Sequence, residues 1–112
     1  MVCAKRIGSV IGIKPEKIDE YQKLHADSNP GVREFLAKAN IHNFSIFIKR
    51  FDDGKYYLFR YFEYTGDDYE ADMAKLAECS QIKAWLAVTD SMQEPLEGES
   101  TWADMERVYY NE

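Results

Sequence analysis

Hydrophobic and polar residues alternate along three stretches of the chain, which predicts three β-strands. The first stretch, from Arg6 to Ile13, has isoleucines and a serine on one side, and two glycines indicate that something bulky approaches it closely. The second and third stretches run from Ile41 to Phe51 and from Tyr56 to Tyr64, and an Asp-Asp-Gly turn at residues 52–54 predicts that they form a hairpin. The third stretch is bulky on both faces, which is typical of a central strand covered by helices or by another subunit.

Apolar residues recur at helical spacing in four other segments. Pro15 suits the first turn of a helix that is expected to end near Ala26, and Glu16 complements its positive end. A cluster of helix-breaking residues at 27–31 precedes a second helical piece. The first two pieces are therefore predicted to form one kinked connection. Two further helices are predicted from Tyr69, Met73 and Leu76, and from Ile82, Trp85, Leu86 and Thr89.

The end of the chain predicts a closing element of the sheet. Residues 95–100 are expected to form a loop, and the tail from Thr101 to Tyr110 is expected to form a strand. The resulting order is that of the ferredoxin-like split βαβ fold, an α+β fold in which a four-stranded antiparallel sheet carries its helices on one face. The aromatic residues of the strands would be exposed to water on the second face of the sheet in a monomer. We therefore expect a homodimer in which the two sheets face each other or curl around a pocket, a dimeric α/β barrel.

Composition restricts the protein class further. The 112 residues are enough for a single domain spanning residues 1–112, with one hydrophobic core. A net charge of −6 and a pI near 4.9 predict no nucleic-acid partner. We also expect no membrane association, because no apolar run reaches the roughly 20 residues that cross a bilayer. Cys3 and Cys79 are far apart and are expected to be free thiols in a cytoplasmic protein.

Tyr21 and His25 form the first candidate constellation. Residues four apart share one face of a helix, and this face also carries apolar residues, so the pair is expected to point inward or into a cleft. Imidazole groups gain and lose protons near neutral pH, which general acid–base catalysis requires. The same pattern also suits a core histidine with satisfied hydrogen bonds beside a packing tyrosine. Trp85 is likewise either a core residue or an indole surface for the apolar face of a sugar.

Other polar residues have an ordinary explanation beside a functional one. His42 and Asn43 either line the rim of a pocket or simply begin a strand, and Glu63 is either a second proton-transfer group or a solvated strand end. The sequence has no HExxH, G-x-S-x-G, P-loop or GxGxxG motif and no cluster with metal-ligand spacing. We therefore predict no cofactor and no metal; an enzyme of this kind would move protons.

Several motifs in order resemble those of the L-rhamnose mutarotase family. They are E-Y-Q-K-L-H at residues 20–25, Pro30, I-H-N-F-S-I-F-I at 41–48, W-L-A-V-T-D-S-M at 85–92 and E-R-V-Y-Y from Glu106. The resemblance implies a cofactor-free isomerase of the mutarotase type that is a dimeric α+β barrel and interconverts the anomers of a free monosaccharide. It implies His25 as the catalytic residue and Tyr21, Phe44 and Trp85 as substrate-binding residues.

This sequence departs from the family pattern at three positions. Phe44 stands where the family typically has tyrosine, Ala84 where it has a second tryptophan, and Asn29 often where it has tryptophan. These changes remove hydrogen bonds and stacking surface, so the preferred sugar is expected to differ within the family. The first hypothesis, from the resemblance, is a deoxy-hexose such as L-rhamnose or L-fucose. The alternatives are a cofactor-free monooxygenase or lactone isomerase of the dimeric α+β barrel group, and a non-catalytic metabolite-binding module.

Overall fold

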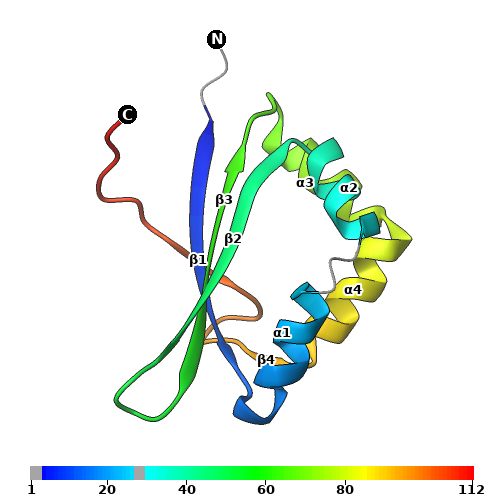
Figure 1. Cartoon of the computed structure of the whole chain (residues 1–112). Helices are drawn as coiled ribbons and strands as arrows, with labels where there is room; N and C mark the ends of the chain where they lie inside the picture. Colours follow the sequence, from blue (N-terminus) through cyan, green and yellow to red (C-terminus); the bar gives the residue numbers. More distant parts are fainter. Residues whose placement is uncertain (1–3, 27–29) are drawn as a thin grey trace.

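The computed structural model describes residues 4–26 and 30–112, which form an antiparallel sheet with its helices on one side (Figure 1). The order of elements agrees with the predicted split βαβ pattern. The strands are β1 (Lys5–Ile13), β2 (Ile41–Arg50), β3 (Tyr56–Tyr64), β4 (Gln93–Glu94) and β5 (Ala103–Met105). The helices are the 3₁₀ turn η1 (Pro15–Lys17) and α1 (Ile18–Ala26), α2 (Pro30–Lys38), α3 (Tyr69–Glu78) and α4 (Ser80–Asp90).

The strand order β2-β3-β1-β4 is that of the ferredoxin-like fold predicted from the sequence. Strand β1 pairs with β3 along its whole length, from Lys5 opposite Tyr64 to Ile13 opposite Tyr56. The predicted hairpin joins β2 to β3, and Phe51 closes it through backbone hydrogen bonds with Lys55 and Gly54. The start of β2 is irregular, because its register with β3 shifts between His42 and Ser45.

The closing edge of the sheet differs from the prediction of one strand from Thr101 to Tyr110. Two short strands share this edge: β4 pairs with the end of β1, and β5 pairs with its middle. Pro95 follows β4 directly and has no N–H to continue the ladder, so the chain leaves the sheet and returns after a loop. The predicted close approach to the glycines of β1 is confirmed, since a Cβ added to Gly12 would lie 2.6 Å from the Glu94 carbonyl oxygen.

The core lies between the helices and the sheet in two clusters. One cluster joins α1 to the sheet and contains Ile11, Ile13, Tyr21, Leu58 and Met92. The other lies beneath α2 and α3 and contains Ala39, Ile41 and Phe62. Odd positions of β1 and even positions of β3 therefore face the helices, because successive side chains of a strand point to opposite sides of the sheet.

The other face of the sheet is not covered by helices (Figure 1). Phe47 is 64% exposed, lies opposite Phe59 in the register and belongs to a group of aromatic residues with Phe51 and Tyr57. Pairing of this face with a second copy stays a prediction. Within the part of the chain that the structure describes, no helix is long and apolar enough to span a bilayer.

Candidate active site

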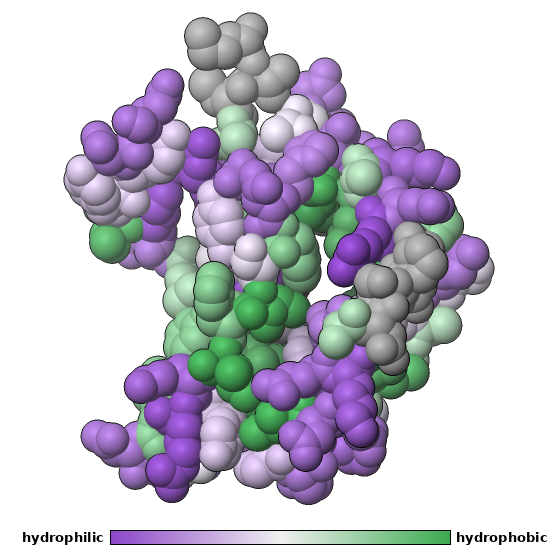
Figure 2. Space-filling model, viewed as in Figure 1, coloured by the Kyte–Doolittle hydropathy of each residue, from purple (hydrophilic) through white to green (hydrophobic). Residues whose placement is uncertain are grey.

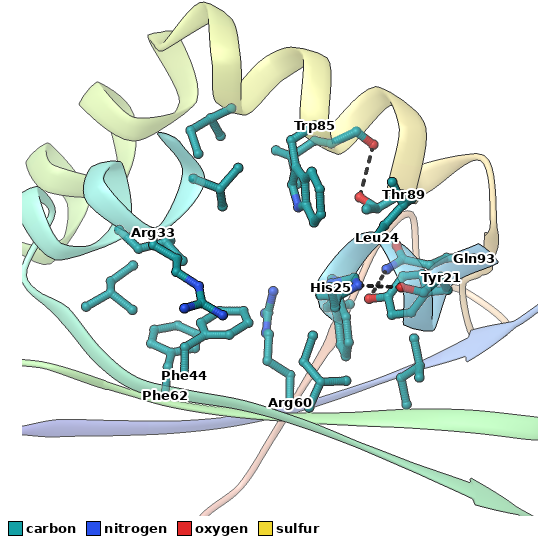
Figure 3. Close-up of a pocket in the computed structure, with 18 of the residues that line it drawn as sticks. Tyr21, Leu24, His25, Arg33, Phe44, Arg60, Phe62, Trp85, Thr89 and Gln93 are labelled. Atoms are coloured by element: carbon teal, nitrogen blue, oxygen red, sulfur yellow. Dashed lines mark hydrogen bonds between the residues drawn. The ribbon is translucent and has the colours of Figure 1, made fainter. Parts of the chain in front are cut away.

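A cavity of about 770 Å³ lies between the helix-facing side of the sheet and helices α1, α2 and α4. Most of its walls are apolar, and its size is typical of pockets that hold small molecules. Figure 2 shows hydrophobic residues gathered beside the opening between sheet and helices. Figure 3 shows Tyr21, His25, Trp85 and Arg60 directed into this space from α1, α4 and β3. Residues far apart in the sequence thus meet in one apolar cavity.

His25 is held by a hydrogen bond to its own helix. Its Nδ1 lies 2.8 Å from the carbonyl oxygen of Tyr21, one turn earlier in α1. A carbonyl oxygen only accepts, so Nδ1 carries the hydrogen and Nε2 keeps a lone pair. The imidazole also lies 4.3 Å from the Tyr21 ring and 5.2 Å from the Trp85 ring, measured between centroids. The ring is therefore fixed in place with a basic nitrogen still available to a ligand.

Tyr21 is almost fully buried, with 4% of its surface exposed, and lies at the edge of the cavity. The Gln93 side-chain amide donates a hydrogen bond of 3.2 Å to the Tyr21 hydroxyl oxygen. Because that bond uses an acceptor site of the oxygen, the hydroxyl hydrogen stays available for donation. Burial raises the pKa of Tyr21, although the hydrogen bond from Gln93 opposes the shift. The raised pKa keeps the Tyr21 hydroxyl protonated near neutral pH, so it is able to donate a hydrogen bond.

Trp85 and Phe44 provide aromatic walls on opposite sides of the cavity (Figure 3). Trp85 descends from α4, where the i, i+3 and i+4 spacing of Ile82, Trp85 and Leu86 turns one face of the helix toward the sheet. Phe44 comes from the irregular start of β2 and stacks on Phe62 at a centroid distance of 5.8 Å. The apolar face of a sugar ring packs on such surfaces.

Two arginines in this cavity were not identified from the sequence. Arg60 projects from the middle of β3, and Arg33 reaches in from α2 (Figure 3). Burial lowers the pKa of Arg60, and nearby Asp104 opposes this effect. The even position that Arg60 shares with Leu58 and Phe62 in β3 would have identified it only once the helix-facing side of the strand was known. Gln93 was also missed, because it is separated from Tyr21 by 72 positions in the chain.

The structure does not bring the remaining sequence candidates to the cavity. His42 is exposed and its Nε2 lies 2.9 Å from the Thr65 hydroxyl oxygen. Glu63 is on the opposite face of β3, where it accepts hydrogen bonds from Tyr61 and Asn43. For these residues the ordinary explanation of a strand end applies. Ala84 is exposed on α4 and does not line the cavity, and Asn29 lies outside the described residues.

The described side chains include no group of three or more His, Cys, Asp or Glu that could hold a metal ion. The described residues that line the cavity offer one imidazole, the phenols of Tyr21 and Tyr69, and two guanidinium groups among apolar walls. An imidazole with a free lone pair beside a hydroxyl donor can move a proton between two oxygen atoms of a bound ligand. The arrangement therefore suits proton transfer between oxygen atoms of a ring-shaped ligand.

Comparison with known proteins gives a consistent result. A sequence profile of L-rhamnose mutarotase matches residues 6–111. The L-rhamnose mutarotase of Mannheimia succiniciproducens is 30% identical over 105 residues, which cover 94% of this chain and 96% of that protein. The L-rhamnose mutarotase of Oceanobacillus iheyensis is 36% identical over 81 residues, 72% of each chain.

Among solved structures, the crystal structure of an L-rhamnose mutarotase from Formosa agariphila superimposes with a TM-score of 0.73. The superposition covers 96% of this chain and 99% of that chain, at 19% sequence identity. At this identity the likeness shows a shared fold. It agrees with the α+β architecture described above.

Proposed function

The chain belongs to the L-rhamnose mutarotase family and is a carbohydrate isomerase, and from this premise we propose that it interconverts the α and β anomers of a free deoxy-hexose such as L-rhamnose or L-fucose. The observation that carries the proposal is the His25 imidazole at the cavity, whose Nδ1–H donates to the Tyr21 carbonyl oxygen and whose Nε2 has no hydrogen-bond partner among the described residues. Interconversion of anomers needs one group that both accepts and donates a proton.

The proposed reaction begins at the anomeric hydroxyl. The Nε2 lone pair of His25 removes the proton from this hydroxyl and delivers it to the ring oxygen, whose bond to the anomeric carbon breaks. The product is the open aldehyde, which rotates about the neighbouring C–C bond and recloses on either face. As the ring closes, Nε2 takes the proton from the C5 hydroxyl and gives it to the carbonyl oxygen, so His25 ends in its starting state. Every step moves protons and breaks or forms one C–O bond, with no change in oxidation state.

Tyr21 supports this reaction as a hydrogen-bond donor. Its hydroxyl hydrogen is not used by Gln93, and the raised pKa of Tyr21 keeps that hydrogen on the oxygen. A donor aimed at the sugar stabilises negative charge that develops on the oxygen as the ring opens. Trp85 and Phe44 bind the ring itself through their apolar faces. His25 therefore transfers protons, and Tyr21, Trp85 and Phe44 position the sugar.

Saturation-transfer NMR tests the proposal, because it measures the rate of anomer exchange directly in a sugar at equilibrium. We expect the protein to accelerate anomer exchange more for L-rhamnose or L-fucose than for D-xylose and D-galactose. His25→Ala and His25→Gln should lower the exchange rate by about 10²-fold or more, since general acid–base catalysis typically contributes at least that much.

His42→Ala is the matched control, because it removes the other histidine, which is exposed and outside the cavity. It should exchange sugars at the rate of the unmodified protein. Full activity of folded His25→Ala would overturn the role of His25. Thermal stabilisation by a sugar without any accelerated exchange would instead identify a binding module, and stabilisation by quinols or lactones alone would identify another enzyme class.

A further inference from the structure

The charged side chains of the cavity are of one sign. Arg33 and Arg60 line it together with His25, and no Asp or Glu is present among the described residues that line it. Figure 3 shows both guanidinium groups directed into the same space, Arg33 above Phe44 and Arg60 beside His25. This is unusual for a chain with a net charge of −6. A cavity that bound only neutral sugars would not require two cations.

Arg60 is incompletely paired within the protein. Its Nη2 donates a 3.1 Å hydrogen bond to Ser9, and Ser9 in turn donates a 2.8 Å bond to Asp104. Its Nε is buried without a partner among the described residues, and no carboxylate forms an ion pair with it there. The rings of Trp102 and Phe62 flank the guanidinium at 4.4 and 5.3 Å. A desolvated cation in this state lowers stability unless a ligand completes its interactions.

The charge balance indicates what that ligand would carry. Asp104 reaches Arg60 through Ser9 and offsets that cation, whereas Arg33, an exposed side chain at the cavity, has no carboxylate beside it among the described lining residues. A single negative charge would balance it. A carboxylate also matches the planar donor fork of a guanidinium, and it loses less hydration in an apolar cavity than a doubly charged phosphate.

We propose that Arg60 and Arg33 form a carboxylate subsite, so that this cavity takes sugar acids of the hexuronate class with the anomeric end at His25 and the carboxylate at the two arginines. The inference rests on the proposed anomer exchange and extends its substrates from neutral deoxy-hexoses to the corresponding acids. A deoxy-hexose and its hexuronate differ only at C6, which carries a methyl group in one and a carboxylate in the other.

Two matched sugar pairs test the subsite. L-fucose is compared with L-galacturonate, and D-fucose with D-galacturonate, by saturation-transfer NMR for exchange and by thermal shift for binding. We expect at least one acid to bind more tightly and to exchange with a higher kcat/KM than its neutral partner. Raising the NaCl concentration from about 0.05 to about 0.5 M should weaken binding of the acid more than binding of the neutral sugar, because salt screens the attraction between opposite charges.

Variants then assign the effect to the arginines. Arg60→Met and Arg33→Met should each lower the kcat/KM ratio of acid to neutral sugar by about tenfold or more, because a charge-assisted bond is lost. Arg50→Met removes the same charge from an exposed residue of β2 outside the cavity, and it should leave the ratio unchanged. Arg60→Met should unfold at the same or a higher temperature, whereas a merely structural arginine would lower it on removal.

The outcomes separate this inference from the proposed function. If the acids stabilise the protein only when Arg60 is present and the protein accelerates exchange of no sugar, the mutarotase proposal is refuted and the carboxylate subsite is retained. Exchange of neutral sugars with no binding of either acid would overturn the subsite and retain the mutarotase proposal. The carboxylate assignment would also be overturned if Arg60→Met lowered kcat/KM equally for the acid and for its neutral partner. Tighter binding of galactose 6-phosphate than of galacturonate would overturn it as well.

Discussion

The two tyrosines at opposite ends of the helix–sheet interface differ in the partners of their hydroxyl groups. Tyr21 and Tyr64 are equally buried, at 4% and 3% exposed. The Tyr21 oxygen accepts from the neutral amide of Gln93. The Tyr64 hydroxyl donates to the Asp72 carboxylate at 2.5 Å and accepts from the Asp68 backbone N–H at 3.1 Å. The hydrogen of Tyr64 is therefore used within the protein, whereas the hydrogen of Tyr21 has no acceptor among the described residues.

This difference separates a tyrosine whose hydroxyl joins two elements of the fold from one that we propose to serve a ligand. Tyr64 joins the end of β3 to α3, and Asn40 completes the cluster by donating to the same oxygen of Asp72. Tyr21 lines the cavity together with His25. Burial alone would rank the two residues as equal. The chemistry of the partner decides which hydroxyl can serve a ligand.

Among the substitutions of these tyrosines, Tyr64→Phe is expected to lower the stability of the folded protein most. Tyr64→Phe removes a hydrogen bond to a carboxylate, and bonds to charged groups are stronger than bonds between neutral groups. We expect the melting temperature to fall by roughly 4–8 °C, measured by circular dichroism. The exchange rate of the folded protein should not change, because Tyr64 does not line the cavity. A loss of exchange at unchanged stability would contradict the structural role.

Tyr21→Phe should have the opposite profile. It removes the donor that faces the sugar, so we expect kcat/KM for anomer exchange to fall by about tenfold, which corresponds to one hydrogen bond. Its melting temperature should fall less than that of Tyr64→Phe, since the bond lost inside the protein joins two neutral groups. Anomer exchange rates and thermal melting curves measured on the same samples test this prediction. Unchanged exchange in this variant would make Tyr21 a packing residue.

The smallest effect is confined to alkaline solution. Burial and the hydrogen bond to Asp72 raise the pKa of Tyr64 to about 12, whereas the pKa of an unfolded tyrosine is about 10. A raised folded-state pKa contributes stability that is complete below about pH 10 and is lost as the pH rises toward about 12. Urea unfolding midpoints should therefore fall less steeply above about pH 10 in Tyr64→Phe than in the unmodified protein.

Tyr109→Phe is the control for this measurement, because the Tyr109 side chain is 77% exposed and lies in the tail after β5. Its unfolding midpoints should follow those of the unmodified protein across the pH range. Equal slopes for Tyr64→Phe and the unmodified protein would show that the Tyr64–Asp72 pair does not govern alkaline stability.

Local patterns in the sequence determined much of the fold. The third strand runs from Tyr56 to Tyr64 as predicted, since the Asp-Asp-Gly turn fixes where the hairpin reverses. Helical spacing placed Tyr21 and His25 on one face, and their rings do lie side by side. These features depend on residues within a few positions of each other. Their roles in catalysis stay a prediction that the exchange measurements decide.

Only the tertiary structure decided which faces meet. The pattern of β3 is bulky on both sides, so it did not reveal that Arg60 faces the helices. The contact of Tyr21 with Gln93 depends on where the chain re-enters the sheet after α4. The division of that sheet edge into β4 and β5 depends on Pro95 and on the glycines of β1. Long-range packing sets these contacts, because alternation fixes the parity of a strand but not the side on which the helices pack.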